Sequence, residues 1–309
     1  MEMRWSLALP TDRADLPEEF VNGPAVAAAA RAAQDCGFDA VYVTDHPAPD
    51  QRWLEGGGHH ALEPMVVLGY AAAVTEHLML QTNVYIAAYR NPFLAAKSVL
   101  SLDLLSGGRA IIGVAAGYLR PEFGALGVEF DERNELLDEC IDVMRKAWTE
   151  DQVAFEGEHF RSRGVTMRPR PVAQPHPPIW VGGNSKAAIR RAVERGDGWV
   201  PFPNPPEASV AVKSPVISSI SDLEQRIEFA RSHSEIVGRS APLDICFSPF
   251  TLDASALMRG DSGALIDEVH ALEAIGVTWL TVSFGEAKNL SEWSGLVDRL
   301  GTDVLGSTK

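Results

Sequence analysis

An aspartate and a histidine stand side by side in the run Thr44-Asp45-His46-Pro47. Adjacent side chains on an extended chain point in opposite directions, so one can face a binding site while the other packs sideways. An imidazole can move a proton near neutral pH, which makes His46 a candidate catalytic residue. The alternative is that the pair only caps a strand through hydrogen bonds to its neighbours.

A second candidate site is the run Trp180-Val181-Gly182-Gly183-Asn184-Ser185, which opens a predicted helix directly after a predicted strand. Backbone N–H groups at a helix N-terminus, unshielded by side chains at two glycines, form a pocket for an anion. The run therefore predicts a phosphate site made by Gly182, Gly183, Asn184 and Ser185. The alternative is a turn followed by a serine or asparagine N-cap.

Two further runs could contact a ligand. Asn83 interrupts an otherwise β-prone run over residues 81–86, so it indicates a bulge, a ligand contact or a core amide bonded to a neighbouring strand. The run Gly113-Val114-Ala115-Ala116-Gly117-Tyr118 lets a ligand approach the backbone or admits tight packing. It is not the GxGxxG fingerprint of dinucleotide-binding proteins.

The sequence lacks the motifs that several other types of site require. His59 and His60 are adjacent in a Gly-rich loop, which is poor spacing for two ligands of one metal, so we expect no metal site. Three cysteines without short spacing exclude a disulfide framework and a CxxC site. The motifs GxxxxGK[ST], HExxH and GxSxG are absent, and no carboxylate pair for glycoside hydrolysis stands out.

The elements that must position these residues alternate between apolar strands and amphipathic helices. We predict strands at about 4–9, 39–44, 78–86, 110–115, 178–182, 198–202, 243–248 and 277–283. We predict helices at about 24–36, 63–76, 93–105, 131–149, 185–195, 222–237, 262–275 and 290–300. Eight such units in 309 residues indicate an α/β fold, a (β/α)8 TIM barrel, with a doubly wound open sheet as the alternative.

Two stretches interrupt the alternation. Residues 151–177 read as a hairpin followed by a Pro-rich extended segment before the fifth barrel strand, and residues 203–221 as an irregular loop after the sixth. Both read as loops on one barrel domain spanning 1–309. In a barrel the site lies at the C-terminal ends of the strands. Loop residues that could line this mouth are Trp53, His59, His60, Tyr89, Arg90 and Tyr118.

The composition limits the partners and the compartment. The chain carries 42 acidic and 27 basic residues, a net charge of -15, which disfavours nucleic acid and anionic membranes. No apolar run reaches the about 18 residues that span a bilayer, and the chain starts without a basic targeting segment. We therefore expect a cytoplasmic protein.

Together these motifs resemble the luciferase-like monooxygenase superfamily, specifically its branch of coenzyme F420-dependent oxidoreductases. The matching stretches follow the family's order over about residues 1–202. They are GFDAVYVTDH (37–46), LQTNVYIAAYRNP (80–92), AKSVLSLDLLSGGRAIIGVAAGY (95–117 and Tyr118), EFGALGVEFDER (122–133) and PPIWVGGNSKAAIRRAVERGDGWVPF (177–202). The last hundred residues match only as generic barrel units. Tyr118 stands where relatives often have a tryptophan.

The resemblance implies a dimeric barrel with a flavin or deazaflavin across its mouth. It implies that Asp45 hydrogen-bonds the deazaflavin region and that His46 transfers the proton. Asn83 and Val84 match the place where the family has a bulge behind the ring, often with a non-prolyl cis peptide. Gly117 matches a turn beside the cofactor tail, and residues 182–185 match the phosphate cradle.

The expected function is hydride transfer between coenzyme F420 and a small organic substrate. The first alternative keeps the fold but uses reduced FMN for monooxygenation. The second is a non-catalytic flavin- or deazaflavin-binding barrel, and the third is an unrelated barrel hydrolase. The expected partners are a small-molecule substrate, a second copy of the chain and a separate reductase that recycles the cofactor.

Overall fold

Eight parallel strands close into a barrel in the computed structural model, which describes residues 2–207, 209 and 214–308. Around the barrel the order is β1-β10-β9-β8-β7-β4-β3-β2. The bounds are β1 Arg4–Ala8, β2 Ala40–Val43, β3 Met79–Ile86, β4 Ala110–Ala115, β7 Ile179–Gly182, β8 Gly198–Val200, β9 Asp244–Phe247 and β10 Trp279–Val282. The (β/α)8 prediction is confirmed, and the open-sheet alternative is wrong because β1 pairs with both β10 and β2.

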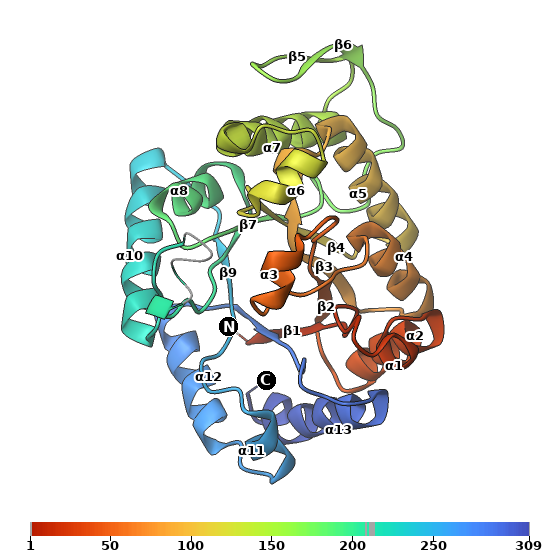
Figure 1. Ribbon diagram of the computed structural model, residues 1–309. Helices are drawn as coiled ribbons and strands as arrows, with labels where there is room; N and C mark the ends of the chain where they lie inside the picture. Colours follow the sequence, from red (N-terminus) through yellow and green to blue (C-terminus); the bar gives the residue numbers. More distant parts are fainter. Residues whose placement is uncertain (1, 208, 210–213, 309) are drawn as a thin grey trace.

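One long helix follows each barrel strand and covers it from outside (Figure 1). These helices are α2 Gly23–Asp35, α4 Pro64–Val74, α5 Pro92–Ser106, α7 Arg133–Thr149, α8 Lys186–Arg195, α10 Ile220–Val237, α12 Gly263–Ile275 and α13 Leu290–Leu300. The predicted boundaries hold to within two residues because capping residues stop the helices locally. Asn22, for example, caps α2 by accepting from the N–H of Ala25.

Two hydrophobic layers flank the strands. The larger lies between strands and helices, and the smaller fills the floor of the barrel lumen with Ala40, Ile111, Trp180, Val200, Cys246 and Trp279. The rings of Trp180 and Trp279 meet there at 5.2 Å between centroids. A packed floor leaves the C-terminal mouth as the place where a ligand can bind.

The first insertion contains the predicted hairpin, formed by β5 Val153–Glu156 and β6 Arg161–Val165, which projects beyond α7 (Figure 1). In the second, Asn204 bridges to Ile217, and α10 starts at Ile220, before the expected loop ends. Residues 208 and 210–213 of that loop lie outside the described residues.

Short helices in the loops escaped the sequence analysis because a single turn shows no periodicity. They are α1 Pro17–Phe20, α3 Gln51–Glu55, η1 Ala87–Tyr89, α6 Arg120–Ala125, η2 Phe130–Glu132, α11 Ala254–Met258, η3 Gly301–Leu305 and α14 Gly306–Thr308. Two of them, α3 and α6, carry residues of the candidate site. None of the helices within residues 2–207, 209 and 214–308 is both long and apolar enough to cross a membrane.

Candidate functional site

His46 follows β2 at the C-terminal end of the barrel and contacts the carboxylate of Glu122, from α6. Nδ1 of His46 lies 3.4 Å from Oε2 of Glu122, and the side chains are only 10% and 3% exposed. The other carboxylate oxygen accepts from the N–H of Ala48 at 3.3 Å. Because a carboxylate accepts, this contact places the imidazole proton on Nδ1 and leaves Nε2 for another partner.

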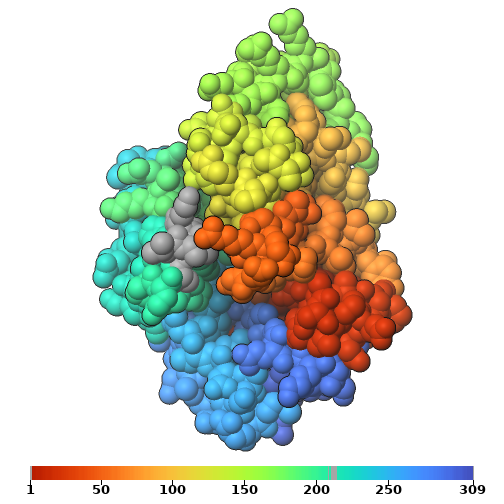
Figure 2. Space-filling model, viewed as in Figure 1, coloured from red at the N-terminus to blue at the C-terminus, as the bar shows by residue number. Residues whose placement is uncertain are grey.

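Three aromatic side chains cover the remaining face of His46. Trp53, from α3, lies 4.5 Å from it between ring centroids, His59 lies 4.9 Å away edge-on, and Tyr118 lies 6.1 Å away. Burial, together with the charge of Glu122, raises the pKa of Tyr118 to about 12. In Figure 2 the segment around α3, in orange, covers the middle of the viewed face. The predicted mouth residues Trp53, His59 and Tyr118 thus converge on His46, whereas His60 is exposed.

Asp45 turns away from His46 and forms a buried ion pair with Arg90. Its carboxylate accepts from Nη2 of Arg90 at 2.9 Å and from the N–H of Ile86 at 2.8 Å. The guanidinium also lies 3.8 Å from the ring centroid of Tyr85. These contacts tie the end of β2 to the end of β3. Because the carboxylate is held by the protein, a cofactor contact of Asp45 stays a prediction.

The predicted bulge lies in β3 at Asn83 and Val84. The pairing of β3 with β4 shifts register between Thr82 and Tyr85, and the Asn83–Val84 peptide bond is cis. The Val84 side chain reaches over Gly182, where an added Cβ would lie 3.1 Å from Cγ1 of Val84. Among the described residues the Asn83 side chain has no hydrogen-bond partner, so its amide remains for a ligand.

The start of α8 supports only part of the predicted phosphate cradle. Gly183 has φ +120°, which favours glycine, but its N–H already donates to the carbonyl of Val200 at 3.1 Å. Ser185 caps the helix by accepting from the N–H of Ala188 at 3.1 Å. The N–H groups of Lys186 and Ala187, which have no acceptor within the helix, remain for an anion.

Asn184 is part of the scaffold beneath this helix start. It is fully buried, and Nδ2 donates to the carbonyls of Phe202 at 2.9 Å and Pro215 at 3.1 Å. Its Oδ1 accepts from the N–H of Phe202 at 3.0 Å. The amide therefore anchors the second insertion to the site, and a direct contact of Asn184 or Ser185 with a phosphate stays a prediction.

Gly117 follows β4 with φ +82°, and an added Cβ would lie 2.8 Å from Cγ2 of Ile86 and 2.9 Å from Cε2 of Phe123. Both the left-handed backbone and the close packing favour glycine there. This packing places α6, and with it Glu122, against the end of β3. The predicted contact of Gly117 with a cofactor tail stays a prediction.

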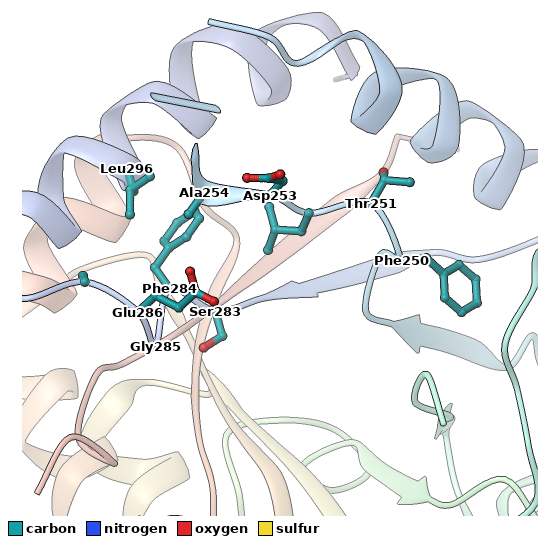
Figure 3. A pocket seen from close by; sticks show the side chains of 11 residues that line it. Phe250, Thr251, Asp253, Ala254, Ser283, Phe284, Gly285, Glu286 and Leu296 are labelled. Atoms are coloured by element: carbon teal, nitrogen blue, oxygen red, sulfur yellow. The ribbon is translucent and has the colours of Figure 1, made fainter. Parts of the chain in front are cut away.

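A cavity of about 710 Å³ opens between the loops after β9 and β10. Figure 3 shows Asp253 and Glu286 on these two loops, with Ser283 and Phe284 nearby. No basic side chain is among its lining residues, and Arg13 beside it donates to the carbonyl of Gly285 at 2.6 Å. The residues that line this cavity carry no distinctive motif, so it was not predicted: the last hundred residues match only as generic barrel units.

Glu122 was not predicted as part of the site. It lay inside a matching stretch, but nothing in its spacing from His46 indicated a contact, because 76 residues separate the two. Only the folded loops bring them together. Within the described part of the chain, no three His, Cys, Asp or Glu side chains gather as a metal site.

The fold and the site define a (β/α)8 barrel with a histidine–carboxylate pair at its C-terminal mouth. Residues 3–216 match the luciferase-like monooxygenase family, and the chain belongs to that family. This confirms the resemblance that the sequence motifs indicated.

Relatives of this chain use two cofactors, according to their names. An F420-dependent glucose-6-phosphate dehydrogenase of Intrasporangium calvum is 36% identical over 174 residues, which cover 54% of this chain and 50% of that protein. An FMNH2-dependent dimethylsulfone monooxygenase of Pseudomonas putida is 34% identical, covering 48% and 41%. An F420-dependent tetrahydromethanopterin reductase of Methanopyrus kandleri matches with a TM-score of 0.74 over 100% of both chains, at 17% identity, and so shows the shared fold.

Proposed function

We propose that this protein transfers a hydride between coenzyme F420 and a small organic substrate, with His46 moving the accompanying proton. The observation that carries the proposal is the buried His46–Glu122 contact at the barrel mouth, close to the ends of β2 and β4. A histidine whose Nδ1 is held by a carboxylate presents Nε2 as a base of defined orientation. The name of the Intrasporangium calvum relative supports F420 as the cofactor.

The residues present fit a deazaflavin. The N–H groups of Lys186 and Ala187 would hold its phosphate, and the unpartnered amide of Asn83 would contact the ring beside Val84. Gly182 keeps the surface beside Val84 free of a Cβ. When bound, the deazaflavin accepts or donates the hydride and does not readily activate oxygen.

The protein's own part in the reaction is orientation and proton transfer. For an alcohol substrate, Nε2 of His46 takes the hydroxyl proton as the adjacent C–H bond loses its hydride. Glu122 stabilises the imidazolium that forms, and Asp45 with Arg90 holds the end of β3 in place. Trp53, His59 and Tyr118 exclude water from His46, which strengthens these electrostatic contacts.

We place this activity in the cytoplasm, with a separate reductase or dehydrogenase that recycles the cofactor. Cys36, Cys140 and Cys246 are all unpaired, as is usual in a reducing compartment. Burial raises the pKa of Cys140 and Cys246 to about 12, so neither thiol supplies a reactive thiolate.

Reduced-FMN monooxygenation is the second candidate, because the Pseudomonas putida relative is named for it. A side-by-side fluorescence titration of the purified protein with F420 and with FMN separates the two. Tight F420 binding with weak FMN binding supports the proposal. Preference for FMN favours the monooxygenase, and binding of neither contradicts both.

A catalytic protein must then be separated from one that only binds. Turnover is followed by F420 absorbance in the absence of oxygen. His46→Ala should lower kcat by ~10²- to 10⁴-fold while F420 affinity changes little. F420 binding without any His46-dependent turnover across a broad substrate screen would indicate the non-catalytic barrel.

A further inference from the structure

The cavity of about 710 Å³ between the loops after β9 and β10 has room for a small organic molecule (Figure 3). Its floor is apolar, because Phe284, Ala287 and Leu296 line it and are at most 3% exposed. Its rim is acidic, because Asp253 and Glu286 line it from the two loops and are exposed. An apolar floor with a charged rim suits a ligand that has a hydrocarbon body and one polar end.

The loop after β9 is held in its shape by the carboxylate of Glu268, on α12, a residue that is only 6% exposed. The carboxylate accepts from the N–H groups of Phe250 at 2.7 Å and Thr251 at 2.8 Å. Both of these residues line the cavity. Burying a charged group is unfavourable unless hydrogen bonds compensate it, so Glu268 fixes the backbone of this loop.

The loop after β10 is held by Arg13, from the loop after β1. Nη1 of Arg13 donates to the carbonyls of Gly285, at 2.6 Å, and of Ala287, while Nη2 lies 2.9 Å from the carboxylate of Asp15. The guanidinium therefore has its own counter-charge, and Arg13 is not among the residues that line the cavity. Because both loops are fixed by the protein itself, a ligand that enters the cavity loses little free energy in ordering them.

The cavity lies at the same end of the barrel as His46. Strand β1 pairs with β10 on one side and with β2 on the other. Adjacent strands are about 4.8 Å apart, so the ends of β10 and β2 are separated by roughly 10 Å. His46 follows β2 and the loop with Glu286 follows β10, so a small molecule can occupy the cavity and reach the imidazole.

The cavity is formed by a part of the chain beyond the family match. That match covers residues 3–216, whereas the lining residues lie between positions 250 and 296. The substrates of relatives therefore do not indicate what this cavity binds, but its own charges do. A phosphate or carboxylate group would meet two carboxylates and no basic side chain among the lining residues, whereas an ammonium group would be attracted by both carboxylates.

We propose that this cavity is the substrate pocket and that it binds an organic cation, a molecule with a hydrocarbon body and an ammonium group, in preference to neutral or anionic molecules. The inference rests on the proposed function, because the same molecule carries the hydroxyl group that His46 deprotonates. The hydroxyl proton passes to Nε2 of His46 as the adjacent C–H bond loses its hydride to the deazaflavin, and the alcohol becomes a ketone. The ammonium group stays beside Asp253 and Glu286 and takes no part in this step.

The first test measures binding without F420. Three probes share one ring and one hydroxyl group: trans-4-aminocyclohexanol is a cation, trans-4-methylcyclohexanol is neutral, and trans-4-hydroxycyclohexanecarboxylate is an anion. The full-length protein is titrated with each probe near neutral pH, and binding is followed by ligand-observed NMR. We expect the cation to bind at least about fivefold more tightly than the neutral probe, and the anion to bind more weakly than either. Added salt should reduce the preference for the cation.

The double variant Asp253→Asn and Glu286→Gln should bring the affinities for the cation and the neutral probe close together. Asparagine keeps the acceptor with which Asp253 caps α11, toward the N–H of Ala256 at 2.9 Å, so the helix start is retained. The matched control is Glu224→Gln with Glu228→Gln, which removes the same charge from exposed positions of α10 that do not line the cavity. A preference that survives in the cavity variant, or that is lost equally in the control, overturns the proposal.

A second variant tests whether the probes bind in this cavity. Ser283→Trp, at an exposed lining position, places a large side chain in the cavity and should abolish binding of both the cation and the neutral probe. Ser255→Trp, at an exposed position of α11 outside the lining, is the control and should bind both probes like the wild type. Unchanged binding of the cation in Ser283→Trp would place the cation elsewhere and overturn the proposal.

F420 titration and turnover separate this inference from the proposed function. Normal F420 binding without a preference for the cation overturns the inference alone. Absence of F420 binding overturns the proposed function and the substrate role, while the cation site is decided by the probe titrations. With F420 bound, kcat/KM for the amino alcohol should exceed that for the methyl alcohol by at least about fivefold, through a lower KM. A higher kcat/KM for the neutral alcohol, or no turnover of the amino alcohol, contradicts the assignment of the cavity as the substrate pocket.

Discussion

Nδ1 of His46 and Oε2 of Glu122 lie 3.4 Å apart at the barrel mouth, although the two residues are 76 positions apart in the chain. Both side chains are nearly buried, so their interaction is screened little by water. The carboxylate orients the imidazole, because it accepts a hydrogen bond from Nδ1. The histidine and the carboxylate that pairs with it thus come from the loops that follow two different strands.

Replacing Glu122 by glutamine should distinguish the role of Glu122 in orienting His46 from the effect of its negative charge. The amide can still accept from Nδ1, but it no longer stabilises the imidazolium, so we expect kcat to fall by ~10- to 100-fold. F420 affinity should stay within about twofold, because Glu122 does not face the phosphate site. Glu135→Gln, on the exposed face of α7, is the control. An unchanged kcat in Glu122→Gln would show that the contact has no role in proton transfer.

A methyl group at Gly113 should disturb the bulge from the barrel side. An added Cβ would overlap the carbonyl oxygen of Thr82, which belongs to the backbone and cannot rotate away. We expect Gly113→Ala to lower the free energy of unfolding by about 3 kcal/mol, the upper range for overpacking, and to weaken F420 binding. Gly124→Ala is the control, because no atom lies within 4 Å of its added Cβ. Denaturant unfolding compares the free energy of unfolding of the two variants. Equal stabilities would contradict the close contact between Gly113 and the Thr82 carbonyl.

We propose that the chain forms a homodimer through α4 and α5, which pack side by side (Figure 1). No charged residue occurs in α4, and Val66 and Leu94 are 70% and 71% exposed. Exposed apolar side chains on adjacent helices are typical of an interface. The double variant Val66→Glu and Leu94→Glu should shift the sedimenting species from dimer to monomer. Ile236→Glu, at a 79% exposed position of α10, should leave the dimer intact, and dimers in both variants would exclude this face.

The half-buried His59 should make the stability of the folded protein depend on pH. Its pKa is lowered in the folded protein, so the unfolded chain binds more protons as the pH falls through the ordinary histidine range near roughly 6.5. The folded state is then favoured above that range and loses stability below it. The raised pKa of Asp12 acts in the opposite sense, but at the lower pH where carboxylates titrate.

We therefore expect Tm to fall less between pH 7.5 and 5.5 in His59→Gln than in the wild type, where these pH values are chosen to span roughly the histidine range. Differential scanning calorimetry across this range measures the effect. His77→Gln should behave like the wild type because its side chain is exposed. A wild-type Tm that rises on acidification over this range would contradict the burial of neutral His59.

The amino-acid sequence by itself determined the barrel strands, the helices around them and the two insertions. Each barrel strand and helix has its own apolar pattern, and stops such as Asn22 before α2 act within one turn, so their boundaries were readable locally. The runs around His46, Asn83 and Gly182 were identified for the same reason, since each follows or interrupts a strand. The hairpin and the irregular insertion were also visible, because Pro and Gly break the alternation.

Only the tertiary structure decided which side chains meet. Glu122 reaches His46, and Arg90 pairs with Asp45, across loops that follow different strands, and such contacts leave no periodic trace in the chain. The structure also gave Asn184 a scaffolding role, because a fully buried amide must satisfy its own hydrogen bonds before it can serve a ligand. Closure of the barrel places these loop ends around one mouth, and that placement is a property of the fold as a whole.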